Sequence, residues 1–522
     1  MKKAIFFCFR IKGRELMDNN EKLEVATKKN VGVVQIKNEQ EYTGDAKIAK
    51  VLTFSAKPNL ETTTVSAGKV TLEGEIDYDL LVVLQDNEIT PLTQKSKFSQ
   101  VFESGEIQEN SVVSADVMLT ELSSSGGGGE ILQLNSTIDA NIFVISKNSE
   151  ISPATVSDGV FVRECEVNFN SIVAVVKYDG VINFELSKDS KMSKILFVKN
   201  SATIKSIIPA VDYFVASGTV FTSIIFETED GTIRSIVKEN NFSEEIEAKG
   251  TIKESNVQAL IFTKEAVATE KSDKNMFVFD VPIVISAQAY NKNCTKTVTD
   301  AYSLKNEVNL TADSFEVGEF SSIRQADENV LTNFTLSESI PQIDKLLATT
   351  PTYITILNQI VKEREVILEG LANINLIYYT EDADGNNVLN SLDVEVPYSI
   401  TLKLPEIAES DQIVSQAVLG DVNVKVKHGR ELEILAEVKA DINQTKVTTS
   451  AITTSITLGE QKIEKDYAME IYLAKNSQTL WDISKELNIS TADLVEQNSD
   501  LTLPLSDGEK IVAYFRKDSE NL

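Results

Sequence analysis

Residues of the types that perform catalysis or bind metal ions are few and scattered in this chain. It has one histidine, His428, and three cysteines, Cys8, Cys165 and Cys294, with no Cys-x-x-Cys or Cys/His cluster. Zinc sites and nucleophile–base pairs need such residues at characteristic spacings. His428 stands in a KHGRE stretch typical of a hairpin turn, without a serine or cysteine motif beside it. The sequence therefore predicts no catalytic residue, no metal site and no cofactor, and we expect that the protein is not an enzyme.

Two further stretches have compositions found in ligand loops. Residues 123–130 read SSSGGGGE, but no lysine follows the glycines as a phosphate-binding loop requires. The acidic runs ETEDG (227–231) and TEDADGNN (380–387) lack the twelve-residue spacing and the closing glutamate of an EF-hand. All three stretches are better interpreted as loops or solvated hairpin turns.

Length and charge restrict the possible classes of protein. A chain of 522 residues with 42% apolar residues is long enough for several domains with cores of their own. The net charge of −29 argues against nucleic-acid binding and against attraction to anionic lipid. No apolar stretch approaches a membrane span of about 18 residues, so we expect no direct membrane insertion. The few dispersed cysteines suit a reducing, cytoplasmic location.

The first residues do not form a convincing signal peptide. The apolar stretch Ala4–Phe9 ends at Arg10 and no small-residue cleavage site follows. Codons for Lys12–Leu16 can form a purine-rich ribosome-binding site directly before the codon of Met17. We therefore predict that residues 1–16 are a mis-annotated leader and that the natural start is Met17 rather than Met1.

The only tryptophan, Trp481, lies in a regular pattern near the C-terminus. An alternating strand is followed by two short amphipathic helices and a closing strand, over about fifty residues. The helix signals are Thr479 with Asp482, Ser490 with Asp493, the stripe of Leu480, Ile483 and Leu487, and a left-handed helix end at Asn498. Trp481 falls beside the stripe rather than at its centre, which leaves two alternatives open: a core residue of a small domain, or a partly exposed anchor at a protein interface.

Three similar segments precede this module. Each has a strand leading into a glycine (Gly74, Gly218 or Gly370), an acidic turn, and a strand ending in an aromatic–serine pair. The period of about 145 residues is that of a domain rather than a solenoid repeat. Because β-branched residues and turn signals dominate, we predict a mainly β fold. The predicted domains are 17–150, 151–300 and 301–462, followed by the small strand–helix–helix–strand domain at 466–516.

The segments VILEG…NLIYYTEDADG and VASGTVFTSIIFETEDG resemble the SPOCS domains of spore coat proteins from spore-forming Firmicutes. The terminal TLWDIS, ISTADLVEQN and LPLSDGEKIV runs resemble a LysM domain. Three SPOCS-like domains before a LysM-like domain resemble a family of coat morphogenetic proteins. The resemblance implies a coat assembly scaffold in the mother-cell cytoplasm, at the forespore surface. Its partner would be stage IV sporulation protein A, a coat ATPase, with self-association or other coat proteins as further contacts.

Two sets of residues are candidates for binding in the LysM-like domain. The partner-binding candidates are Lys475, Gln478, Trp481, Asp482 and Lys485, because an aromatic anchor with local charge suits a protein interface. A LysM domain implies a glycan groove, which would comprise Ser477, Gln478, Thr479, Leu505, Ser506 and Asp507. The usual Gly-Asp of that groove is replaced by Ser477 and Gln478. The alternative function is therefore a cell-wall protein that binds peptidoglycan or N-acetylglucosamine, and a third class is an adhesin of stacked β domains.

Overall fold

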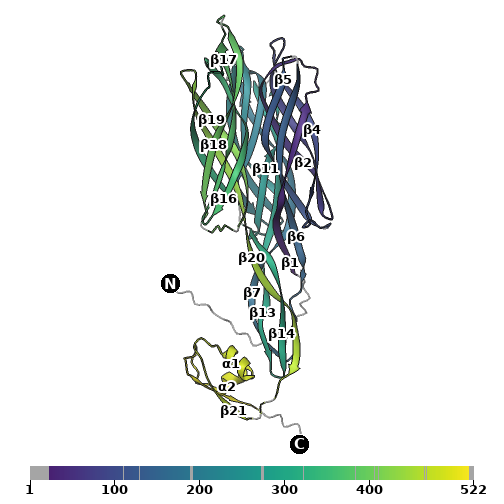
Figure 1. Cartoon of the computed structure of the whole chain (residues 1–522), viewed down its shortest axis with the longest axis vertical. Helices are drawn as coiled ribbons and strands as arrows, with labels where there is room; N and C mark the ends of the chain where they lie inside the picture. The colour runs from purple at the N-terminus through teal and green to yellow at the C-terminus, as the bar shows by residue number, and fades with distance from the viewer. Residues whose placement is uncertain are drawn as a thin grey trace.

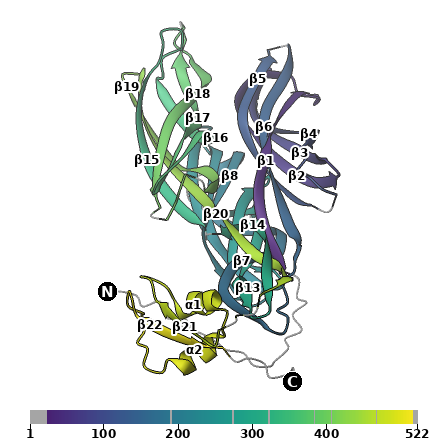
Figure 2. The ribbon, with the colours of Figure 1, turned by 60° about the horizontal axis from the view of Figure 1, so that its bottom comes forward.

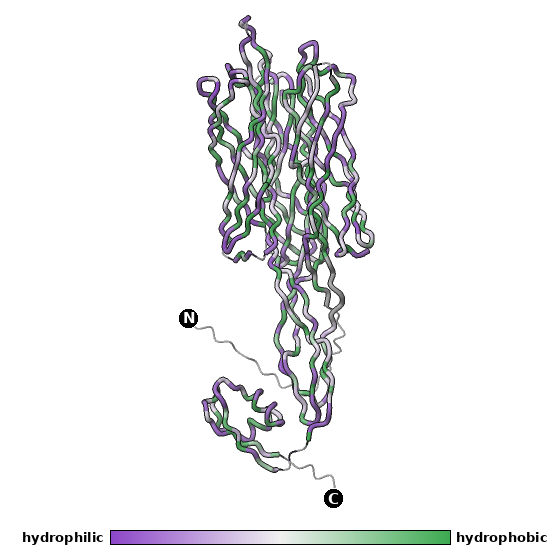
Figure 3. Tube along the Cα trace, in the orientation of Figure 1, coloured by the Kyte–Doolittle hydropathy of each residue, from purple (hydrophilic) through white to green (hydrophobic). Residues whose placement is uncertain are grey.

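The computed structural model describes residues 23–515 except 110, 129, 189–191, 272–274, 321–322, 383, 405, 410, 464 and 466. The predicted leader, with Cys8 and both candidate start residues Met1 and Met17, lies outside the described residues. The fold is mainly β, as the sequence predicts, and long antiparallel strands form three units that stand side by side above a narrow stalk (Figure 1). Hydrophobic and hydrophilic residues alternate along many of these strands (Figure 3).

Unit 1 comprises two three-stranded antiparallel sheets, in the orders β1-β6-β5 and β2-β3-β4. Its strands are β1 (Leu23–Glu41), β2 (Ile48–Ser66), β3 (Lys69–Leu84), β4 (Ile89–Glu103), β5 (Val112–Gly127) and β6 (Glu130–Ile151). One apolar cluster contains buried residues of both sheets, including Leu72 and Ile138. Unit 1 is therefore a sandwich in which each sheet buries one face.

Units 2 and 3 repeat this arrangement. The strands of unit 2 are β7 (Val160–Ser187), β8 (Met192–Pro209), β9 (Tyr213–Thr228), β10 (Ile233–Glu247), β11 (Asn256–Thr263), β12 (Val267–Lys271) and β13 (Met276–Ser303). Those of unit 3 are β14 (Asn306–Phe320), β15 (Arg324–Thr335), β16 (Lys345–Lys362), β17 (Glu365–Glu381), β18 (Asn387–Lys403), β19 (Gln412–Lys427) and β20 (Glu431–Gln461). The sheets β10-β9-β8 and β16-β17-β18 correspond to β2-β3-β4, and each unit has its own apolar cluster.

The repeat glycines have a steric role in these sheets. Gly74, Gly218 and Gly370 lie directly opposite Phe98, Phe242 and Tyr398 on the neighbouring strand. The aromatic ring covers each glycine, and a β-bulge on the other neighbouring strand brings a carbonyl oxygen close to it. A methyl group on Gly218 would lie 2.0 Å from the carbonyl oxygen of Thr203 and 2.7 Å from Cζ of Phe242. No side chain fits there, which explains the shared glycine–aromatic pattern.

The central strands β3, β9 and β17 also join the units to one another. Their first halves alternate between buried and half-buried residues, but their second halves are buried on both faces. Leu81, Ile225 and Ile377, which stand equally far after the three repeat glycines, meet in one apolar cluster. The three units therefore pack around a common axis, with pseudo-threefold symmetry.

The stalk consists of the outer strands of the units, which continue below the sandwiches (Figures 1 and 2). Strand β13 pairs with β7 from Met276–Ser187 to Ser303–Val160, and β20 pairs with β14. Its small core includes Val25, Phe169, Phe315 and Ile452, from four different strands. The stalk ends at the turn between β13 and β14, beside the C-terminal module (Figure 2).

Candidate functional site

The C-terminal module contains the residues that the sequence marks as candidates for binding. It comprises β21 (Met469–Leu473), α1 (Leu480–Leu487), α2 (Thr491–Gln497) and β22 (Lys510–Tyr514), with β21 antiparallel to β22. Its apolar core includes Ile483, Leu487, Leu494 and Ile511. The stripe expected on the first helix therefore faces the interior of the module.

Hydrogen bonds at the helix ends fix the module locally. Thr479 and Asp482 form the predicted capping box, and Ser490 accepts from the backbone N–H of Asp493. The predicted left-handed end at Asn498 is wrong, because that residue has φ −133°. Its side chain bonds to Val512 of β22 instead, in both directions at 2.6 and 2.8 Å. The left-handed residue is Asn488, which ends α1 with φ 56°.

Trp481 docks the module onto the end of the stalk. Its indole Nε1–H donates to Oδ2 of Asp300 at 2.8 Å, and its ring meets Tyr302 edge-on, with 4.9 Å between centroids. Both partners belong to β13. Only 5% of Trp481 is exposed, so the alternative of partial exposure is wrong. Helical spacing shows which side of α1 carries the indole, but a contact with a strand 181 residues away leaves no local signal.

Polar contacts surround this aromatic pair. Lys485 forms an ion pair with Asp300, and the Asn488 amide donates to the Leu304 carbonyl at 2.7 Å. The Tyr302 hydroxyl donates to the backbone carbonyl of Ile489 at 2.9 Å. Burial opposes the ionisation of Asp300, but hydrogen bonds from Lys485 and Trp481 outweigh it and hold its pKa below the ordinary value. The carboxylate is therefore the charged centre of the docking contact.

The chain between the stalk and the module joins the same contact. Nζ of Lys462, just after β20, donates to the Ser303 carbonyl and to Oδ1 of Asn488, at 2.9 Å each. Arg163 of β7 lies 3.9 Å from Asp482 of α1. The docking surface is thus defined by residues of the stalk, the connecting segment and the module. The stalk contributes Arg163, Asp300, Tyr302, Ser303 and Leu304, the connecting segment Lys462, and the module Trp481, Asp482, Lys485, Asn488 and Ile489.

The five predicted partner-binding residues therefore divide into two groups. Trp481, Asp482 and Lys485 face the stalk. Lys475 and Gln478 lie in the loop before α1, where the Gln478 side chain accepts from the backbone N–H of Lys475 and donates to the Tyr472 hydroxyl. Stalk residues 300–304 of the docking surface were not found from the sequence, because the run TDAYSLKN contains no recognisable motif.

The residues of the suggested glycan groove lie on two loops that touch. The backbone N–H of Asn476 donates to Oδ1 of Asp507 at 3.1 Å, beside Ser477 and Ser506. Ser477 has φ 70°, the left-handed conformation for which glycine is favoured. Thr479 caps α1 and Leu505 is buried in the module core. Of the six candidates, Ser477, Gln478, Ser506 and Asp507 therefore remain at or near the surface of the loops.

Repeated antiparallel β sandwiches with a small terminal helix-containing module define the structural class. The family model described as SipL, SPOCS domain, matches residues 47–125 and 342–427. These segments cover β2–β5 of unit 1 and the equivalent strands β16–β19 of unit 3. Segments of units 1 and 3 are therefore similar to the SPOCS domain of SipL, and this similarity supports a sporulation-related coat role. No curated protein and no solved structure matches the chain.

Among the described residues, no helix is both long enough and apolar enough to cross a bilayer. Both helices belong to the terminal module and are at most eight residues long.

Proposed function

We propose that the protein is a non-enzymatic scaffold of the spore coat, which acts on the mother-cell side of the forespore surface. Its terminal module, which we interpret as a LysM domain, binds a coat ATPase of the stage IV sporulation protein A type. The three β units hold the module at the end of a stalk and provide surfaces for self-association or for other coat proteins. The SPOCS-domain match supports the coat role.

The observation that carries the partner-binding role is the composition of the docking surface on the module. Trp481 is followed by Asp482 and, about one helical turn later, by Lys485, and an aromatic anchor beside charged groups is typical of interface hot spots. Trp481 is absent from the module's own apolar cluster, which forms around Ile483 and Leu494. The indole therefore serves recognition rather than the folding of the module.

In this proposal the partner takes the place of the stalk. The ion pair of the docking contact is partly exposed, with 45% of the Lys485 side chain and 30% of the Asp300 side chain accessible. Such pairs contribute about 0–1 kcal/mol. An intramolecular contact on a short connecting segment can open without unfolding either part, and an open module presents Trp481 to its partner.

Retention of the coat ATPase by the immobilised full-length protein tests this function. We expect Trp481→Glu to abolish retention and Asp300→Ala to increase it, because the latter frees the module. Lys510→Ala, which removes an exposed lysine on β22 of the same module, is the matched control and should leave retention unchanged. Undiminished retention by Trp481→Glu would refute the proposal. Binding of N-acetylglucosamine oligomers by a chain that retains no ATPase would favour the glycan function instead.

A further inference from the structure

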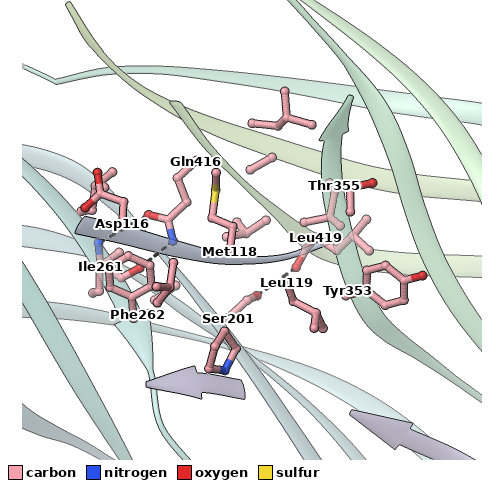
Figure 4. A pocket seen from close by; sticks show the side chains of 18 of the residues that line it. Asp116, Met118, Leu119, Ser201, Ile261, Phe262, Tyr353, Thr355, Gln416 and Leu419 are labelled. Carbon is pink, nitrogen blue, oxygen red and sulfur yellow. Dashed lines mark hydrogen bonds between the residues drawn. The ribbon is translucent and has the colours of Figure 1, made fainter. Parts of the chain in front are cut away.

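A cavity of about 410 Å³ lies where the three units meet. It is lined by equivalent strands of each unit, namely β2 and β5, β8 and β11, and β16 and β19. Figure 4 shows side chains of all three units converging on it, such as Met118 of unit 1, Ser201 of unit 2 and Tyr353 of unit 3. Its volume lies within the range of about 300–1,000 Å³ found for small-molecule sites.

Hydrogen bonds between the units hold this cavity in shape. The Ser201 hydroxyl donates to the Leu419 carbonyl at 3.1 Å, and the Gln416 amide donates to the Ile261 carbonyl at 2.6 Å (Figure 4). Both bonds join unit 2 to unit 3. The site is thus formed by the assembled units and does not exist in any single one.

Two lysines place positive charge at the cavity. Nζ of Lys57 lies 3.6 Å from a carboxylate oxygen of Asp79, with both side chains nearly buried. Lys199 lines the same cavity, but among the described residues it has no hydrogen bond and no ion pair. Burial and then the charge of Lys57 lower the pKa of Lys199 to about 7. The carboxylate of Asp79 opposes this shift, but it lies beside Lys57 as well, so the two ammonium groups and the one carboxylate leave an excess positive charge.

Lys199 is not a residue that the repeat requires. It pairs with Ser223 across β8 and β9, and the equivalent pairs are Ser55 with Asp79 in unit 1 and Thr350 with Asn375 in unit 3. Neither of the other two units has a cation at this strand position.

The carboxylates at the cavity do not balance this charge. Asp116 also lines the cavity. Burial raises the pKa of Asp116, and the positive charge of Lys28 opposes this shift, so the neighbouring cation of Asp116 is Lys28. Asp139 accepts a long hydrogen bond of 3.4 Å from Gln35. Much of the remaining lining is apolar, including Met118, Leu119, Phe262 and Ile354. The surroundings of Lys199 therefore combine an excess positive charge with apolar walls.

We propose that the cavity binds a small organic anion whose carboxylate or phosphate head pairs with Lys199 and Lys57 and whose apolar body packs against β5, β11 and β16. A ligand in this position contacts all three units and so stabilises their packing, because it binds only the assembled state. This site is independent of the terminal module and of its partner.

Calorimetric titration of the full-length protein with sodium octanoate tests this proposal, with 1-octanol as the uncharged probe of equal chain length. We expect one octanoate to bind per chain, at least tenfold more tightly than octanol, and to raise the melting temperature. Lys199→Met should reduce octanoate affinity at least tenfold and leave octanol affinity unchanged. The control Lys37→Met removes an exposed lysine of β1 and should bind octanoate normally. Equal binding of octanoate and octanol, or unchanged affinity in Lys199→Met, would overturn the proposal.

A second measurement uses the unaltered protein, so its result does not depend on the folding of a variant. Reductive methylation near pH 7 modifies amines that are partly unprotonated, and peptide mass spectrometry quantifies each lysine. We expect saturating octanoate to protect Lys199 several-fold and to leave the modification of Lys37 unchanged. Equal modification of Lys199 with and without octanoate would contradict binding at this site.

Discussion

Trp481 of the terminal module donates its indole hydrogen to Asp300 of the stalk, across 2.8 Å and 181 residues of sequence. Because the chain has no other tryptophan, its fluorescence reports on this one contact. The indole is 5% exposed when docked, so undocking transfers it to water. The state of the module can therefore be observed directly in the full-length protein.

The first prediction concerns Asp300→Ala. Loss of the carboxylate removes the partner of both Trp481 and Lys485. The hydrogen bond from the indole to this charged group contributes about 1.5–3 kcal/mol, and the partly exposed ion pair about 0–1 kcal/mol. We expect the tryptophan emission to shift to longer wavelength and acrylamide quenching to increase, without loss of β-sheet signal in circular dichroism. Asp313→Ala, which removes an exposed aspartate of the stalk strand β14, should behave like the unaltered protein. An unshifted emission in Asp300→Ala would show that the contact does not hold the module.

The second prediction concerns the cap of α1. Thr479→Ala removes one half of the capping box and should destabilise the module by about 1 kcal/mol. Hydrogen exchange of the α1 backbone amides at increasing urea concentration measures this, because Trp481 fluorescence would also change when the module undocks. Thr502→Ala alters an exposed threonine of the same module and should leave this exchange unchanged. The account would be wrong if both substitutions changed the exchange equally.

The third prediction concerns the repeat glycines. In Gly218→Ala the new methyl group would collide with the Thr203 carbonyl and the Phe242 ring, both of which belong to well-packed sheets. Overpacking of this kind costs about 1–3 kcal/mol, so we expect a lower melting temperature. Gly105→Ala is the matched control, because a methyl group there meets no atom within 4 Å. Equal melting temperatures of the two variants would argue against the steric role.

The fourth prediction is a pH dependence from Asp441 of β20. Burial raises its pKa to about 7, although the backbone N–H of Ile204 and the Gln325 amide donate to the carboxyl group. The folded protein therefore retains a proton that the unfolded chain releases from about pH 4 upward. Stability contributed by this group falls as the pH rises from about 4 to about 7.

Asp441→Asn should remove this decline and raise the free energy of unfolding at pH 8, by up to about 4 kcal/mol for a shift of about three units. Asparagine retains an acceptor for Ile204, and Gln325 can turn its own amide to match. Urea unfolding of both proteins at several pH values gives the comparison, with the exposed Asp327→Asn as control. A parallel decline in the unaltered protein and in Asp441→Asn would exclude Asp441 as its source.

Local patterns were sufficient to predict part of this structure. The capping residues Thr479 and Ser490 act within a few positions of their partners, so their roles can be read from spacing. Gly218 and Phe242 were recognised as parts of a repeat, although the collision that links them became evident only from the strand register. The mainly β fold followed from turn signals and β-branched residues in the same way.

Contacts between distant segments were not predictable in this way. Leu81, Ile225 and Ile377 lie in apolar runs that would suit any strand buried on both faces, so their meeting at one axis has no sequence signal. The contact of Trp481 with Asp300 and the position of Lys199 at the cavity depend on how whole units pack. In each case the residue type is informative only after its neighbours are known.

Calorimetric titration of the full-length protein with stage IV sporulation protein A tests the central claim most directly, when the unaltered chain is compared with Asp300→Ala and Trp481→Glu. If the stalk and the partner compete for one face of the module, Asp300→Ala should bind more tightly, by about tenfold for each 1.4 kcal/mol of docking energy removed. Trp481→Glu should give no binding heat. Equal affinity of all three proteins would contradict the account, because it would place the partner's contact away from Trp481.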